Sequence, residues 1–121
     1  MIMERLTMQE EEIMLHIWKL GPCFIRDILN EMEEPRPPYT SVASVVRNLE
    51  RKGYVSAEKL GVITRYAPII KEKQYKRVFM SKVVSDYFTG SYKEMVSFFI
   101  RDRKLSRNDL QDLMNQIENE E

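Results

Sequence analysis

Residues 39–69 join the pattern of an amphipathic helix directly to the pattern of a short hairpin, and few folds connect these two units in this order. Apolar residues recur with the i, i+3, i+4, i+7 spacing of one helix face, and they are Val42, Val45, Val46 and Leu49. This spacing predicts a helix over residues 41–52, capped at its start by Thr40 or Ser41 and at its end by Gly53. Two strand-like segments, 54–58 and 62–69, follow and are joined through Lys59-Leu60-Gly61.

The opposite face of this predicted helix is polar. Its members are Ser41, Ser44, Arg47, Asn48 and Arg51. Short hydroxyl side chains near the helix start permit a close approach to a groove, while arginine and asparagine can bond base edges or phosphates. A recognition helix followed by a β-wing is the order found in winged helix-turn-helix proteins, which bind DNA. A plain solvated helix face is the alternative interpretation of the same residues.

Charge is distributed unevenly, although the formal net charge is zero. Residues 1–34 hold three Lys/Arg and eight Asp/Glu, whereas residues 36–65 hold six Lys/Arg and two Asp/Glu. A basic helix and wing are the electrostatic feature expected of phosphate contact, although a charged surface needs no ligand. From helix position and charge, the residues predicted to contact DNA are Thr40, Ser41, Ser44, Arg47, Asn48, Arg51, Lys52, Lys59 and Arg65.

The segments before this unit predict two supporting helices. Thr7 and Glu10 have the spacing of a capping box, and the helix that they start is predicted to end before Gly21-Pro22. A second helix is predicted over residues 26–32, and three prolines within residues 35–38 forbid helix there. The single histidine, His16, lies beside the apolar stripe of the first helix and is predicted to be structural.

Beyond residue 71 the pattern is helical throughout. Helices are predicted over residues 72–88, around residues 95–99, and after a cap at Ser106. Three such helices carry more large apolar groups than they can enclose alone. Pairing with a second copy of the chain is the economical solution, and folding back on the N-terminal domain is the alternative. The residues predicted to form the dimer interface are Val78, Phe79, Val83, Tyr87, Phe98, Phe99, Leu110, Leu113, Met114 and Ile117.

Composition and motifs argue against several classes of function. Hydrophobic residues make up 43% of the chain and charged residues 31%, which is typical of a soluble globular protein. No apolar run approaches the roughly 20 residues of a membrane span, so no membrane insertion is expected. Residues 1–5 do not begin a secretory signal and Cys23 is the single cysteine, which favours the cytoplasm. The sequence has no metal-ligand spacing, phosphate loop or nucleophile motif, so neither an enzyme nor a metal or cofactor is expected.

Over nearly its whole length the chain resembles the penicillinase repressor family, the BlaI/MecI regulators. The resemblance lies in Leu6-Thr7-Met8-Gln9-Glu10-Glu11-Glu12-Ile13-Met14, residues 40–55, Arg65-Tyr66-Ala67-Pro68 and residues 88–106. It implies a dimeric repressor of a palindromic double-stranded DNA operator, with Ser41 and Ser44 standing where threonine is usual in the DNA-contacting helix. The family pattern has an arginine just before the leucine that is Leu49 here, whereas this chain has Asn48 there.

The resemblance also implies how repression ends. Family repressors are inactivated by cleavage in the short helix of the dimerisation region, triggered by a membrane sensor protease in response to an antibiotic or cell-envelope signal. The matching bond in this chain is Phe98–Phe99. A copper-responsive branch of the family carries a cysteine-rich C-terminal motif, which residues 111–117 lack.

The predicted fold is mainly α with a small β-wing. A winged helix-turn-helix DNA-binding domain is expected over residues 1–70 and an α-helical dimerisation domain over residues 71–121. The leading functional interpretation is a homodimeric, sequence-specific transcriptional repressor. The alternative is a winged-helix protein-interaction module without specific DNA binding. A regulator that responds to a small molecule is a third option, but no polar pocket can be read from the sequence.

Overall fold

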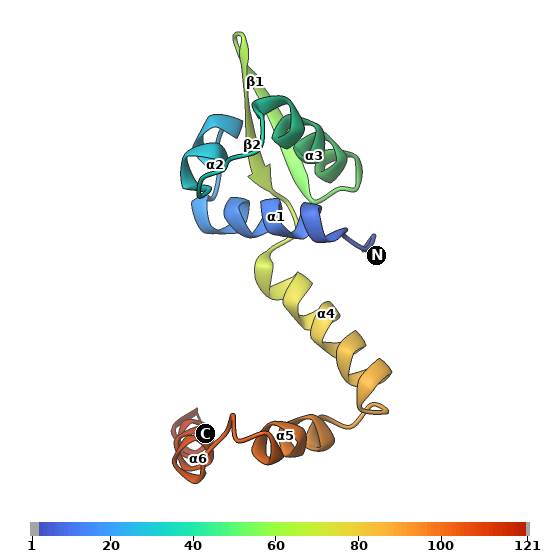
Figure 1. Cartoon of the computed structure of the whole chain (residues 1–121), viewed down its shortest axis with the longest axis vertical. Helices are drawn as coiled ribbons and strands as arrows, with labels where there is room; N and C mark the ends of the chain where they lie inside the picture. Colours follow the sequence, from blue (N-terminus) through green and yellow to red (C-terminus); the bar gives the residue numbers. More distant parts are fainter. Residues whose placement is uncertain (1–2, 121) are drawn as a thin grey trace. The chain divides into compact units, whose positions relative to one another are not determined.

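The computed structural model describes residues 3–120, which form six helices and one two-stranded sheet (Figure 1). In chain order the elements are α1 (Met8–Leu20), α2 (Ile25–Glu31), α3 (Tyr39–Arg51), β1 (Val55–Leu60), β2 (Ile63–Pro68), α4 (Glu72–Tyr87), α5 (Tyr92–Arg101) and α6 (Arg107–Glu120). The chain divides into two compact units, the first ending at Lys76 and the second beginning at Arg77. The predicted fold class, a winged-helix unit followed by a helical unit, is confirmed.

The first two helices are fixed by side chains that cap them. The Glu10 amide donates to the Thr7 hydroxyl at 3.1 Å, and the Thr7 amide donates to the Glu10 carboxylate at 2.8 Å. This reciprocal pair is the predicted capping box. α2 begins at Ile25, one residue earlier than predicted, because the Asp27 carboxylate accepts the Phe24 amide at 2.8 Å and fixes the first turn there.

α3 begins at Tyr39, so the prediction that Thr40 or Ser41 caps it is wrong. The N-cap is Pro38, whose carbonyl accepts from the amides of Ser41 at 3.0 Å and Val42 at 3.3 Å. No side chain caps this helix. Proline presets its own φ close to the value found here, −61°, so the proline segment leads directly into the first turn. The prediction for the other end is also one residue off, since the C-cap is Lys52 and Gly53 follows it with φ +82°.

One hydrophobic core holds the first unit together. It is built from α1, α2, α3 and the base of the hairpin, and its most deeply buried side chains are Met14, Ile17, Ile28, Val42, Val46, Leu49, Tyr54 and Val55. The predicted inward face of α3 is confirmed, because its four spaced apolar residues are all buried. Full burial of each such aliphatic side chain contributes about 1.5–3 kcal/mol, so packing against α1 and α2 determines how α3 is rotated.

The wing is an antiparallel hairpin whose register runs from Val55 opposite Pro68 to Leu60 opposite Ile63. β1 continues through Leu60, so the turn is Gly61-Val62 and lies one residue later than predicted. Gly61 has φ +68°, a conformation that glycine adopts readily and that tight hairpin turns require. An isolated bridge adds Cys23 beside β2, with backbone hydrogen bonds of 2.8 Å in both directions to Tyr66.

The first unit extends past the wing because aromatic side chains join the start of α4 to the core. The Trp18 indole donates to the Ile70 carbonyl at 2.8 Å. The Tyr75 ring packs 5.3 Å from that of Trp18 and 6.0 Å from that of Tyr54, and its hydroxyl donates to the Glu11 carboxylate. The first unit therefore ends at Lys76, inside α4, and not at residue 70, where the sequence pattern changes.

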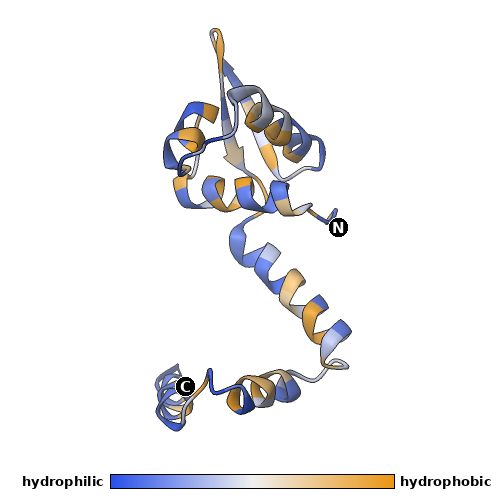
Figure 2. Cartoon of the chain, in the orientation of Figure 1, coloured by the Kyte–Doolittle hydropathy of each residue, from blue (hydrophilic) through white to orange (hydrophobic). Residues whose placement is uncertain are grey.

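The second unit has little interior of its own. Of the side chains that the structure describes from residue 77 onward, Val84 alone is buried. Figure 2 shows apolar segments recurring along α4, α5 and α6, next to hydrophilic ones. Within residues 3–120, no helix combines the length and the apolar character needed to cross a membrane.

Candidate nucleic-acid interface

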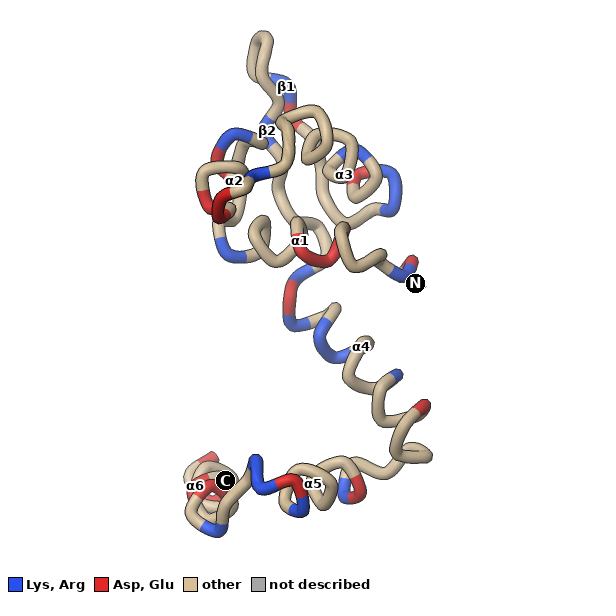
Figure 3. The backbone as a smooth tube through the Cα atoms, in the orientation of Figure 1, with Lys and Arg blue, Asp and Glu red and all other residues tan. Residues whose placement is uncertain are grey.

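The exposed face of α3 carries four of the residues predicted to contact DNA. Thr40, Ser44, Arg47 and Arg51 are all exposed. At about 100° per residue these positions project within one narrow sector, opposite the buried valines. Two short hydroxyls at the start of the helix and two guanidinium groups farther along thus form one continuous polar surface. Figure 3 shows the basic residues toward the C-terminal end of α3.

Three other predicted contacts lie on the flank of α3 that faces α1. Ser41 and Asn48 are half-buried, and so is Lys52. The sequence pattern placed Ser41 and Asn48 with the exposed face because neither residue is apolar. Packing of the helix against α1 turns them aside, so Arg47 is the long donor that stands fully outward near the middle of α3.

Lys52 has a structural partner. Its Nζ lies 2.6 Å from Oε1 of Glu10 and 3.1 Å from the carbonyl oxygen of Arg5, and the two charged side chains are only 14% and 7% exposed. Burial by itself raises the pKa of Glu10, but hydrogen bonds from Lys52 and Thr7 outweigh it, and the net pKa lies below the ordinary value. The ammonium therefore ties the end of α3 to the start of α1 and is not directed toward a ligand.

The two basic residues of the wing point to opposite faces of the hairpin. Lys59 pairs with Thr64 and Arg65 pairs with Glu58 in the strand register, and side chains of successive strand residues alternate between faces. Arg65 also forms an ion pair with Glu58, with 2.9 Å between Nη2 and Oε1. A duplex that meets one face of the wing therefore meets only one of the two cations, and Lys59 shares its face with Tyr66.

The tip of the wing is apolar. Leu60, Val62 and Ile63 are exposed there, and Val62 is exposed completely. Figure 3 shows this tip as a stretch without charged residues. The wing's cations therefore lie on its stem, in the second and third residue pairs from the turn.

The flank of α3 opposite Lys52 carries a contact that the sequence analysis missed. The guanidinium carbon of Arg26, on α2, lies 5.6 Å from the centroid of the Tyr39 ring, at the first residue of α3. Burial raises the pKa of the Tyr66 hydroxyl and Glu50 raises it further, while Arg47 lowers it. Tyr66 thus lies within electrostatic reach of α3 from the wing side. Arg26 is the only basic residue between Lys19 and Arg36, but its tyrosine partner cannot be read from the sequence.

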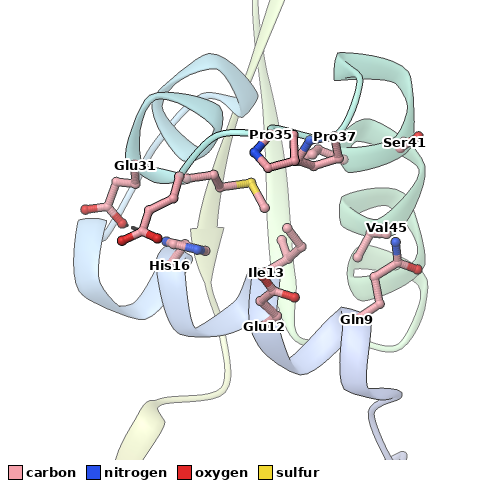
Figure 4. A pocket seen from close by; sticks show the side chains of 12 residues that line it. Gln9, Glu12, Ile13, His16, Glu31, Pro35, Pro37, Ser41 and Val45 are labelled. Atoms are coloured by element: carbon pink, nitrogen blue, oxygen red, sulfur yellow. Dashed lines mark hydrogen bonds and ion pairs between the residues drawn. The ribbon is translucent and has the colours of Figure 1, made fainter.

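A cavity of about 540 Å³ opens between α1, α2, the proline segment and the start of α3 (Figure 4). Apolar side chains and acids line it, among them Ile13, Val45, Glu12 and Glu33. Glu31 at its edge is bonded to His16 Nδ1 at 2.9 Å and to Lys19 Nζ at 3.1 Å, and the pKa of Glu31 is lowered by these two partners. His16, which was predicted to be structural, thus pairs with a carboxylate of α2. The acidic lining does not suit a phosphate, so the cavity is not part of the candidate interface.

The residues predicted for the dimer interface are largely exposed in the single chain. Val78, Phe79, Tyr87, Phe98, Phe99, Leu113, Met114 and Ile117 are exposed, and Val83 and Leu110 are half-buried. On α6 the apolar residues share one face, because Leu110, Leu113, Met114 and Ile117 follow the i, i+3, i+4, i+7 spacing. On α5 the Phe98 ring lies 5.7 Å from Phe88 and 5.4 Å from Phe99.

Comparison with known proteins agrees with this architecture. The model of the penicillinase repressor family matches residues 6–119. The methicillin resistance regulatory protein MecI of Staphylococcus epidermidis is 23% identical over 108 residues, covering 88% of this chain and 87% of that protein. The penicillinase repressor of Bacillus licheniformis is 25% identical over 111 residues, covering 90% of this chain and 86% of that protein. The family match extends through both units, and the chain belongs to the penicillinase repressor family.

Proposed function

We propose that this chain represses transcription as a homodimer that binds a palindromic operator in double-stranded DNA. The observation that carries the proposal is the exposed surface of α3, where Thr40, Ser44, Arg47 and Arg51 stand together beside the wing. A helix with small hydroxyl groups at one end and guanidinium groups farther along is suited to enter a major groove. Lys59 on the stem of the wing adds a cation for the neighbouring phosphates.

A second copy of the chain is the natural partner for the exposed apolar faces of α4, α5 and α6. A two-fold dimer would place two α3 helices in successive major grooves, roughly one helical turn apart, and would match the symmetry of a palindrome. The name of one relative refers to methicillin resistance, and that of the other refers to penicillinase. An antibiotic or cell-envelope signal is accordingly the proposed inducer.

Selection of bound duplexes from a random DNA library, with purified protein at moderate salt, tests this function. Enrichment of a palindrome with half-sites about one helical turn apart is expected. No enrichment from folded protein would reject sequence-specific binding. A winged-helix module that binds a partner protein would then be the better description of the chain.

Replacing Arg47 by alanine should lower operator affinity and relax the sequence preference. A good bidentate contact to a base accounts for about 1–3 kcal/mol of discrimination, and Arg47 is the outward donor nearest the middle of α3. Binding curves on the selected operator and on duplexes with single base changes measure both effects. An equal loss on every duplex would make Arg47 a phosphate contact, and Asn48→Ala, on the half-buried flank, serves as the control with a smaller effect.

Cleavage near the Phe98–Phe99 bond is the proposed route of induction, by a membrane sensor protease of the family type. The bond lies within α5, and both phenylalanine side chains are exposed in the single chain. A protease must unwind part of α5 to reach the backbone, so cleavage would destroy a helix that also carries interface residues. Mass spectrometry of protein from induced cells should show fragments that end near residue 98. Intact chain throughout, while the target genes are expressed, would contradict this route.

A further inference from the structure

We infer that Arg26 and Tyr39 form a phosphate-binding site that extends the DNA interface from α3 onto α2. The inference rests on the proposed function, because the ligand is the phosphodiester backbone of the bound duplex. The site is defined by the 5.6 Å contact between the Arg26 guanidinium and the Tyr39 ring. That separation is within the range of a cation–π contact.

The contact with the ring prepares the guanidinium to bind an anion. The planar group carries five N–H donors, and those directed away from the ring can donate paired hydrogen bonds to phosphate oxygens. An arginine that is already held against a ring also loses less side-chain freedom when it binds. Tyr39 thereby acts as the support, and Arg26 is the group that binds the phosphate.

The charge of Arg26 is also available. Among the described residues, no ion pair engages Arg26; the basic partners in the ion pairs are His16, Lys19, Arg36, Lys52, Arg65 and Lys82. The adjacent carboxylate, Asp27, accepts the Phe24 amide at the start of α2. Glu50 shares the Tyr39 flank of α3 but lies eleven residues along the helix, roughly 16 Å away at 1.5 Å per residue.

Both residues are held in place by their backbones. Cys23, three positions before Arg26, is bonded to Tyr66 of the wing, and the Asp27 carboxylate fixes the turn that contains Arg26. Tyr39 is the first residue of α3 and directly precedes Thr40, whose side chain is exposed. Arg26 therefore stands beside the hydroxyl-bearing end of the α3 surface, on the flank away from α1. A duplex that lies over this end of α3 brings its backbone to Arg26.

Affinity measured against salt on two duplexes tests the assignment. The two duplexes are the selected operator and a scrambled sequence of the same composition. Binding of the Arg26→Gln variant to each is compared with binding of the wild type. We expect about a tenfold loss on both duplexes at low salt. The slope of log affinity against log salt should fall by about one, as for the removal of one phosphate contact. Lys19→Gln, which removes one positive charge from the end of α1, is the matched control and should leave both quantities unchanged.

Variants of Tyr39 separate the support from the charge. Tyr39→Phe keeps the ring and should bind like the wild type, whereas Tyr39→Leu should weaken binding without changing the salt slope. Arg26→Lys keeps the charge and loses the planar group, so it should give an intermediate affinity at the wild-type slope. Thermal unfolding followed by circular dichroism establishes that each variant is folded.

Wild-type affinity and slope for Arg26→Gln would overturn this inference, and so would a loss confined to the operator, which would make Arg26 a reader of bases. Neither result would affect the proposed function, provided that the wild type binds its operator. A wild type that binds no duplex would remove the proposed function and this inference together.

Discussion

Replacing Leu113 and Ile117 together by glutamate is expected to convert the protein from a dimer to a monomer and to weaken operator binding at least about a hundredfold. The two side chains are 45% and 58% exposed in the single chain, on the apolar face of α6. Glutamate is a good helix former, so the monomer should keep its fold. In a symmetric interface, however, the new carboxylates would be desolvated and would face one another. A monomer cannot hold both half-sites at once. It therefore loses the gain in affinity that linked binding gives, which is roughly 10²–10⁴-fold.

Sedimentation velocity at a fixed protein concentration and binding to the selected operator measure the two effects. The matched control is Gln111→Glu with Asn115→Glu, which adds the same charge at the same i, i+4 spacing on the polar side of α6, outside the apolar face. The Gln111 side chain donates to the Asn115 side chain there at an exposed site, with 3.1 Å between Nε2 and Oδ1. The control should therefore remain dimeric. A glutamate variant at Leu113 and Ile117 that still sediments as a dimer would place the interface elsewhere.

Replacing Lys52 by methionine is expected to lower the free energy of unfolding by about 3 kcal/mol at pH 7, the lower end of the cost of breaking a buried ion pair. The change removes the ammonium but keeps much of the apolar stem, so the Glu10 carboxylate stays in a nearly buried position without its main partner. Urea unfolding at a fixed protein concentration measures the loss. The double variant Glu10→Gln with Lys52→Met should recover part of it, because no buried charge remains.

The same pair gives a dependence on pH with a definite sign. The pKa of Glu10 is lowered in the folded protein, so its ionised form contributes stability above its ordinary pKa, and that contribution is lost as the pH falls through the folded value. In Lys52→Met, burial without the ammonium should instead raise the pKa of Glu10. The stability difference between the two proteins should therefore begin to shrink as the pH falls through the raised pKa of the variant, above about pH 4.5, and should shrink further until the pH has passed the lowered pKa of the wild type. A difference that stays constant with pH would show that Lys52 acts through packing of its stem.

Local patterns in the sequence were sufficient to predict most of the first unit. The Thr7–Glu10 capping box spans three residues, and the buried face of α3 follows from the spacing of its valines and Leu49, so both could be predicted without knowledge of distant contacts. The start of α3 was misplaced because the hydroxyls of Thr40 and Ser41 looked like caps, whereas the preset φ of Pro38 begins the helix earlier.

The features of the candidate site that the sequence does not predict depend on contacts between residues that are distant in sequence. Lys52 was assigned to DNA because it is basic and follows the helix, but its carboxylate partner lies 42 positions earlier, at Glu10. The 100° rotation per residue gives the positions of Ser41 and Asn48 around the helix. Whether they are exposed depends on how α3 is rotated against α1, which the sequence does not show. The contact of Arg26 with the Tyr39 ring joins two helices across the proline segment, so neither residue alone indicated it.

The position of Cys23 gives the chain its own chemical reporter of unfolding. It is the single cysteine, it is buried, and burial together with Asp27 and Glu31 raises the pKa of its thiol to about 11. Only the thiolate attacks alkylating reagents, so at neutral pH the native protein should react very slowly. Cys23 can then react only after its backbone hydrogen bonds to Tyr66 have opened. The labelling rate therefore measures how often this part of the fold opens. A variant that lowers the stability of the first unit, such as Lys52→Met, would be labelled faster, while a variant changed only on the exposed face of α3, such as Arg47→Ala, would keep the rate of the wild type.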